Sequence, residues 1–145
     1  MLNKIKLIFY ILIFLSFYTF VSSAENFFEE AKKNYNEKKM EDSKFLFQRN
    51  IVFNPKDSKS YLYLAKIYNY ENNEYEEEKN LNTALLLEPD NEEATYMLIK
   101  IELKRSNYSK VKDLSETFIK VCKKLCDENV QNKKSLKNIE SKNES

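Results

Sequence analysis

The sequence predicts an all-α protein in which pairs of antiparallel helices repeat at a regular interval. Apolar and aromatic residues recur at spacings of three and four, and no segment alternates as a strand would. The chain has 2 prolines, Pro55 and Pro89, and they stand 34 positions apart. Because proline cannot continue a helix, each of them marks the end of one helix pair.

The first 24 residues have the pattern of a secretory signal peptide. Two lysines precede an almost wholly apolar run, Leu7–Val21, and small residues at 22–24 precede Glu25. We therefore expect export, most simply to a bacterial periplasm, with cleavage before Glu25. The alternative is a retained anchor in the inner membrane that leaves the protein facing the periplasm. The run of 15 residues is shorter than the roughly 18 that a membrane span requires.

Composition argues against catalysis and against nucleic acid. The chain has no glycine and no histidine, so glycine-rich phosphate loops and histidine-assisted nucleophiles are excluded, as are imidazole metal sites. Removal of the leader takes away two of the 24 basic residues and none of the 23 acidic ones, which leaves a net charge of −1. A nucleic-acid binder usually shows a basic excess on one face. We expect no enzyme activity, no cofactor, no metal, no nucleic acid and no small-molecule substrate.

The part after the leader, residues 25–127, divides at the interval of the prolines into units 24–57, 58–91 and 92–127. Polar breaks at 36–42, 69–75 and 104–108 separate two helices within each unit, with Asn and Ser in the places where glycine would be usual. Asp90 and Glu93 have the spacing of a capping box at the start of the third unit. Residues 128–145 are polar, and we expect a disordered tail.

The middle unit carries a known pattern of large, small and aromatic residues. Its matching residues are Tyr61, Leu64, Ala65, Tyr68, Ala84 and Pro89. In this respect the chain resembles the tetratricopeptide repeat family, whose repeat has the same length. The resemblance implies about three helix hairpins in a right-handed superhelix.

The first and third units follow the pattern less closely. The first unit matches at Phe27, Ala31, Ser43, Phe47 and Pro55, with Glu30 in place of the usual Leu. The third unit matches at Leu98, Tyr108 and Val111, and it departs at Ile99, Glu102 and Lys123. Loss of the pattern in the third unit is typical of a terminal repeat that caps the array.

The family resemblance also implies a concave groove lined by the first helix of each unit. One position of the repeat gives a lysine in all three units, and another gives an apolar or aromatic row beside these lysines. The candidate groove residues are Phe28, Lys32, Tyr35, Leu62, Lys66, Asn69, Tyr70, Tyr96, Lys100 and Lys104. Such a surface suits a peptide with acidic and bulky apolar side chains. The same lysines could equally form an ordinary solvated face.

Two further stretches invite a chemical interpretation. The acidic run at 74–79 lies in the first turn of a helix, where hydrated glutamates favour the helix dipole. Cys122 and Cys126 would lie on one helix face about 6 Å apart along the axis, so a disulfide would require the helix to end or distort there. Two free thiols on a packed helix face are the alternative.

Together these observations favour a non-catalytic protein-interaction module of the cell envelope, with a peptide or protein partner in the groove. A membrane-tethered structural subunit with a retained leader is the alternative, and contact with the membrane is then expected through the N-terminal segment alone. A thiol-redox protein using the two cysteines is a minor alternative.

Overall fold

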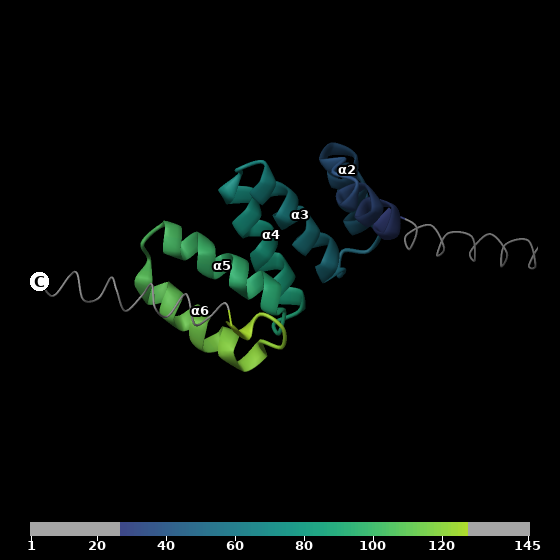
Figure 1. Cartoon of the computed structure of the whole chain (residues 1–145). Helices are drawn as coiled ribbons and strands as arrows, with labels where there is room; N and C mark the ends of the chain where they lie inside the picture. The colour runs from purple at the N-terminus through teal and green to yellow at the C-terminus, as the bar shows by residue number, and fades with distance from the viewer. Residues whose placement is uncertain (1–26, 128–145) are drawn as a thin grey trace, which may run out of the picture. The chain divides into compact units, whose positions relative to one another are not determined.

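In the computed structural model the structure describes residues 27–127, so the predicted leader and polar tail lie outside the described residues. The described part is helical with no strand, which confirms the all-α prediction. Contacts between residues divide the chain after Lys56 into two compact units. The first unit contains a helix over residues 27–36 and α2 (Met40–Phe53). The second contains α3 (Ser58–Tyr70), α4 (Glu74–Leu87), α5 (Glu92–Lys104) and α6 (Tyr108–Val121) (Figure 1).

The turns inside the helix pairs are built alike although their residues differ. Lys38, Asn72 and Ser106 adopt left-handed φ angles of 62°, 58° and 58°, and they stand at equivalent positions of the repeat. At each turn the next residue donates its N–H five positions back, as in Asn73 to the Tyr68 carbonyl at 2.9 Å. These are Schellman motifs, in which glycine is the usual left-handed residue. The sequence thus makes the same turn three times without glycine.

The helix ends follow the sequence signals with one exception. The C-caps of α2 and α4 are Asn54 and Glu88, each directly before a proline, as predicted. At the start of α5 the N-cap is Asn91, whose Oδ1 accepts from the N–H of Ala94 at 3.0 Å. The predicted capping box of Asp90 and Glu93 is therefore wrong.

In the first unit, aromatic rings hold the two helices together. Phe47 is fully buried and meets the ring of Phe28 edge-on at 5.7 Å, while Phe27 stacks on Phe53 at 5.8 Å. Ser43 Oγ donates to the carbonyl of Ala31 at 2.8 Å. Small residues at the crossing let the helices approach this closely.

In the second unit α3 packs on α4, α4 on α5, and α5 on α6. One core cluster joins α3, α4 and α5, and a second joins α5 to α6. The first is Leu62, Ala65, Leu81, Ala84, Ala94, Leu98 and Ile101; the second is Ile99, Val111 and Phe118. The departure from the repeat pattern at Ile99 is explained by an exchange of side-chain size. Ile99 on α5 is larger than Ala65, its equivalent in the middle unit, whereas Ser115 on α6 is smaller than its equivalent, Leu81. All four residues are buried.

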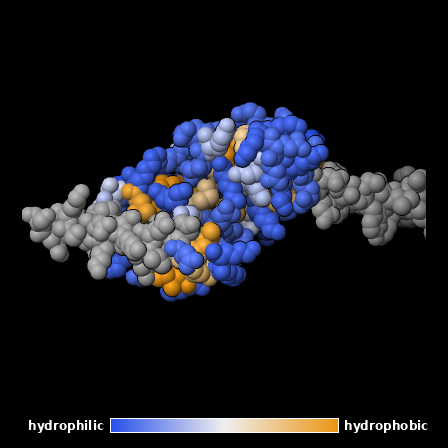
Figure 2. Space-filling model, in the orientation of Figure 1, coloured by the Kyte–Doolittle hydropathy of each residue, from blue (hydrophilic) through white to orange (hydrophobic). Residues whose placement is uncertain are grey.

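Most of the visible surface of the described residues is hydrophilic, with apolar side chains gathered in small patches (Figure 2). Between residues 27 and 127 no helix is long and apolar enough to cross a membrane.

Candidate functional site

A hollow of about 180 Å³ lies where the end of α3 and the start of α4 meet α5. Its lining combines two lysines, two glutamates, an amide and two apolar side chains. The lining residues are Asn69, Glu74, Glu77, Met97, Lys100, Ile101 and Lys104. The structure therefore brings together three of the predicted groove residues, and it adds two acids that sequence reasoning assigned to a solvated turn.

Glu77 is a buried carboxyl inside this hollow. Its residue is 5% exposed, and Asn69 Nδ2 lies 3.0 and 3.1 Å from its two carboxylate oxygens. Burial raises the pKa of Glu77, and the Asn69 hydrogen bond opposes that rise. The prediction that the glutamates of this run stay hydrated is wrong for Glu77. The repeat period could have predicted the burial of Glu77. Ser43 and Val111 occupy the equivalent position in the other two units, and they are also buried.

Lys104 reaches the hollow but its ammonium is engaged. Its Nζ lies 2.7 Å from Glu74 Oε2, and Arg105 Nε contacts the other oxygen of Glu74 at 2.8 Å. The hydrogen bonds from Lys104 and Arg105 lower the pKa of Glu74, and the bond from Lys104 has the larger effect. Arg105 continues the network to Glu78 at 2.7 Å. Lys104 is thus held in a chain of ion pairs that ties α5 to α4.

Lys100 is the more available cation. Its residue is exposed, and its Nζ lies 5.7 Å from the centre of the Tyr96 ring. Among residues 27–127 no carboxylate forms an ion pair with it. Met97 and Ile101, on the same turn of α5 as Lys100, supply apolar surface to the hollow. The hollow therefore offers the ammonium of Lys100 beside two apolar side chains and the buried carboxyl of Glu77.

Lys66, the preceding lysine of the row, is already paired. Its Nζ lies 2.8 Å from Glu93 Oε2 and 4.8 Å from the centre of the Tyr63 ring, and its side chain is 19% exposed. It does not line the hollow. Lys32 is half-buried in the first compact unit, so its place in a common row stays a prediction.

The predicted apolar row takes part in packing between helices. Leu62 is 7% exposed and belongs to the core that joins α3, α4 and α5, so its assignment to the groove is corrected. Tyr96 packs on Phe118 with ring centres 6.0 Å apart, and Phe28 packs on Phe47. Phe28 and Tyr96 are half-buried by these contacts, so their part in a groove stays a prediction.

The two tyrosines of the predicted groove lie apart from the hollow. Tyr35 is half-buried in the first compact unit, whereas Tyr70 is 69% exposed at the end of α3. Neither lines the hollow. Their role in binding stays a prediction.

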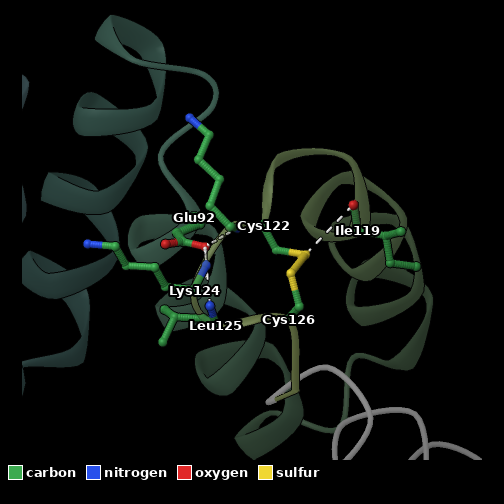
Figure 3. The surroundings of a disulfide bond; sticks show 7 residues. Glu92, Ile119, Cys122, Lys124, Leu125 and Cys126 are labelled. Atoms are coloured by element: carbon green, nitrogen blue, oxygen red, sulfur yellow. Dashed lines mark hydrogen bonds between the residues drawn. A yellow bond between two sulfur atoms is a disulfide. The ribbon is translucent and has the colours of Figure 1, made fainter.

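Cys122 and Cys126 are joined by a disulfide, with Cα atoms 5.3 Å apart. α6 ends at Val121, so the chain leaves the helix before the ring closes. Within the ring, the N–H groups of Lys123, Lys124 and Leu125 all point to one oxygen of Glu92 (Figure 3). Sequence reasoning missed Glu92, because nothing local links it to a loop that follows a full helix pair later.

Comparison with known proteins shows the fold. No protein-family model and no curated protein matches the sequence. The type III secretion chaperone SycD of Yersinia enterocolitica, in complex with a peptide of the translocator YopD, is similar with a TM-score of 0.71 and 14% identity, over 84% of this chain and 95% of that one.

Two further solved structures agree. The Sgt2 TPR domain of Aspergillus fumigatus gives a TM-score of 0.69 at 13% identity, over 85% of this chain and 83% of that one. The TPR2B domain of yeast Sti1, in a complex with pHsp70, gives 0.69 at 15% identity, over 79% and 96%. The chain therefore has a tetratricopeptide-type fold, as the resemblance in its sequence implied.

Proposed function

We propose that this tetratricopeptide-type chain is a non-catalytic interaction module that binds a peptide segment of a partner protein across the hollow between α3, α4 and α5. The observation that carries the proposal is the exposed ammonium of Lys100 beside the apolar side chains of Met97 and Ile101. A partner that places a carboxylate beside a bulky apolar residue matches this arrangement in both charge and shape.

The proposal is supported by the similarity of the fold to those of SycD and the Sti1 domain. SycD is described with a peptide of YopD and the Sti1 domain with pHsp70, and they are similar to this chain in fold at 14% and 15% identity. A fold alone does not assign a partner, so the residues that line the hollow of this chain carry the proposal. The lack of histidine and glycine in the sequence supports a role without catalysis.

The internal acids of the hollow sharpen the expected selectivity. Glu74 is neutralised by Lys104 and Arg105, while Glu77 is buried with Asn69 as its donor. A partner carboxylate would therefore contact Lys100 without displacing an existing ion pair. A partner lysine or arginine would meet the ammonium of Lys100 and be repelled.

Binding of synthetic peptides tests the proposal directly. Fluorescence anisotropy would compare the Kd of labelled peptides that carry an acid beside an apolar residue with that of versions in which the acid is amidated. Lys100→Glu should weaken the acidic peptides at least about tenfold, since it replaces an attraction by a repulsion of roughly 1.4 kcal/mol or more. Lys112→Glu is the matched control, because Lys112 is an exposed lysine on α6 outside the hollow.

Two results would contradict the proposal. One is an equal loss of affinity in Lys100→Glu and Lys112→Glu, which would indicate unspecific attraction. The other is an affinity that does not depend on the acid of the peptide. Circular dichroism of both variants would establish that helical content is retained.

We also propose that the protein is exported to a periplasm, on the strength of the leader-like sequence of residues 1–24. N-terminal sequencing of the native protein tests this. A start at Glu25 supports export with cleavage, and a start at Met1 favours the tethered structural subunit instead. A thiol-reductase assay that compares the protein with its Cys122→Ser variant tests the minor redox alternative.

A further inference from the structure

A disulfide, backbone hydrogen bonds and apolar packing hold the loop after α6 in place. The disulfide between Cys122 and Cys126 closes a short ring. Glu92 Oε2 accepts from the N–H groups of Lys123 at 2.5 Å, Lys124 at 2.9 Å and Leu125 at 3.3 Å. Three successive N–H groups that converge on one oxygen form a nest, a backbone arrangement that binds anions.

The third interaction that holds the loop is apolar packing. Leu125 and Cys122 are partly buried against the cluster of Ile99, Val111 and Phe118, which is the last core cluster of the described chain. The loop therefore packs on the apolar cluster that joins α5 to α6. Exposure of this cluster would enlarge the apolar part of the surface.

The ring and the nest depend on each other. A helix aligns its N–H groups along its axis towards carbonyls four residues back, so successive N–H groups point to different acceptors. At Cys122 the backbone turns to an extended conformation, φ −64° and ψ 137°, and the three following N–H groups can then meet at Glu92. The disulfide restricts this short stretch to few conformations, which lowers the entropic cost of closing it on Glu92.

We propose that the Cys122–Cys126 disulfide is a reducible latch, which keeps the loop over residues 122–126 closed on Glu92 and releases it when a dithiol reduces the bond. Cys126 is exposed, so a thiolate can reach the disulfide. The attacking thiolate forms a mixed disulfide with one protein sulfur, and the other leaves as a thiolate that takes up a proton. The second thiol of the reductant then displaces the first cysteine. The protein disulfide has accepted two electrons and two protons, and the dithiol has become a disulfide.

Release follows because the two interactions that remain, the hydrogen bonds to Glu92 and the packing of Leu125, are both partly exposed to water. Glu92 is partly exposed, so water competes for the same oxygen, and the freed loop regains the conformations that the ring excluded. Leu125 then leaves the cluster of Ile99, Val111 and Phe118, and the apolar surface beneath it becomes accessible.

Hydrogen exchange measured by mass spectrometry on the full chain tests the latch. The protein would be oxidised in a glutathione disulfide buffer and compared with the same protein reduced by dithiothreitol. We expect the amides of Lys123, Lys124 and Leu125 to exchange at least about tenfold faster after reduction, with α3 and α4 unchanged. Binding of an apolar fluorescent dye should rise in parallel, because the cluster beneath Leu125 is uncovered.

Three outcomes would overturn the latch. If the loop amides exchange equally in both states, Glu92 and Leu125 hold the loop without the disulfide. If exchange accelerates throughout α3 to α6, the disulfide is a staple of the whole unit. If the protein stays a dithiol in the oxidising buffer, as its mass would show, no latch forms.

Two variants separate the parts of the device. The Cys122→Ser/Cys126→Ser variant should show the fast exchange permanently and ignore dithiothreitol, since the chain has only 2 cysteines. Glu92→Gln should speed exchange of the same three amides while the disulfide remains intact by mass. A Glu92→Gln protein with fully protected loop amides would show that the nest contributes nothing, which would also contradict the proposed mechanism.

Discussion

Lys110 Nζ lies 2.6 Å from Oε1 of Glu102, a carboxyl that is 1% exposed. Asn107 Nδ2 donates to the other oxygen of Glu102 at 2.9 Å, and Arg105 lies 3.8 Å away. The equivalent residue of the middle unit is Tyr68, so Glu102 places a charge where the family pattern has an aromatic ring. Cations from the turn and from α6 surround it, and in this way the charged residue links α5 to α6.

Removal of Lys110 should expose the cost of that buried charge. Lys110→Met is expected to lower the free energy of unfolding by about 1–3 kcal/mol. This loss is smaller than the usual cost of breaking a buried ion pair, because the Lys110 side chain is 46% exposed. Glu102→Leu/Lys110→Met should recover at least about 1 kcal/mol of that loss, because no unpaired charge is left. Urea unfolding of both variants measures this. A double variant less stable than Lys110→Met would contradict the argument.

The left-handed turns give a second prediction. Ser106→Gly should stabilise the protein by about 0.5–1 kcal/mol, because the steric cost of a left-handed residue of roughly 1–2 kcal/mol is relieved and the entropic cost of glycine offsets part of the gain. Ser109→Gly is the control: Ser109 lies in α6, where glycine should destabilise by about 0.5 kcal/mol relative to serine. Thermal melting would compare the two, and a lower Tm for Ser106→Gly than for the parent would refute the steric account.

Two buried serines should respond oppositely to alanine. In the described part of the chain Ser115 Oγ has no hydrogen-bond partner, whereas Ser43 Oγ donates to Ala31 at 2.8 Å. Ser115→Ala should therefore stabilise by about 1 kcal/mol, since an unsatisfied buried hydroxyl is removed. Ser43→Ala should cost about 1 kcal/mol, since the buried hydrogen bond to the Ala31 carbonyl is lost. Urea midpoints measure both, and an equal loss in the two variants would contradict the assignment.

The sequence predicted those features that depend on neighbours along the chain. The prolines after Asn54 and Glu88, the turns at Asn72 and Ser106, and the helical spacing of apolar residues are all local signals. The repeat period then predicted the same pair of helices in each unit, because residues at equivalent positions of the repeat are buried alike.

Features that depend on contacts between helices were not predicted. Lys66 and Lys100 occupy the same repeat position, yet Glu93 neutralises one and no acid pairs with the other among the residues described. The difference is set by which residue the next helix brings close. Leu62 failed as a groove residue for the same reason, since α5 covers it. Glu92 could not be linked to its loop, because the loop follows only after both α5 and α6.

The bond between Glu92 and the loop gives the last prediction, a pH dependence. The N–H groups of Lys123 and Lys124 hold the pKa of Glu92 below its ordinary value. A carboxyl with a depressed folded-state pKa stabilises the protein fully above the unfolded-state pKa, and that contribution is lost as pH falls through the folded-state value. Glu92→Gln should therefore unfold at lower urea than the parent at pH 7, and the gap should narrow as pH falls from about 4.3 through the lower folded-state pKa. Glu116→Gln, an exposed glutamate of α6, controls for net charge. A gap of the same size at pH 2.5 would show that the stabilisation does not come from the ionised carboxylate.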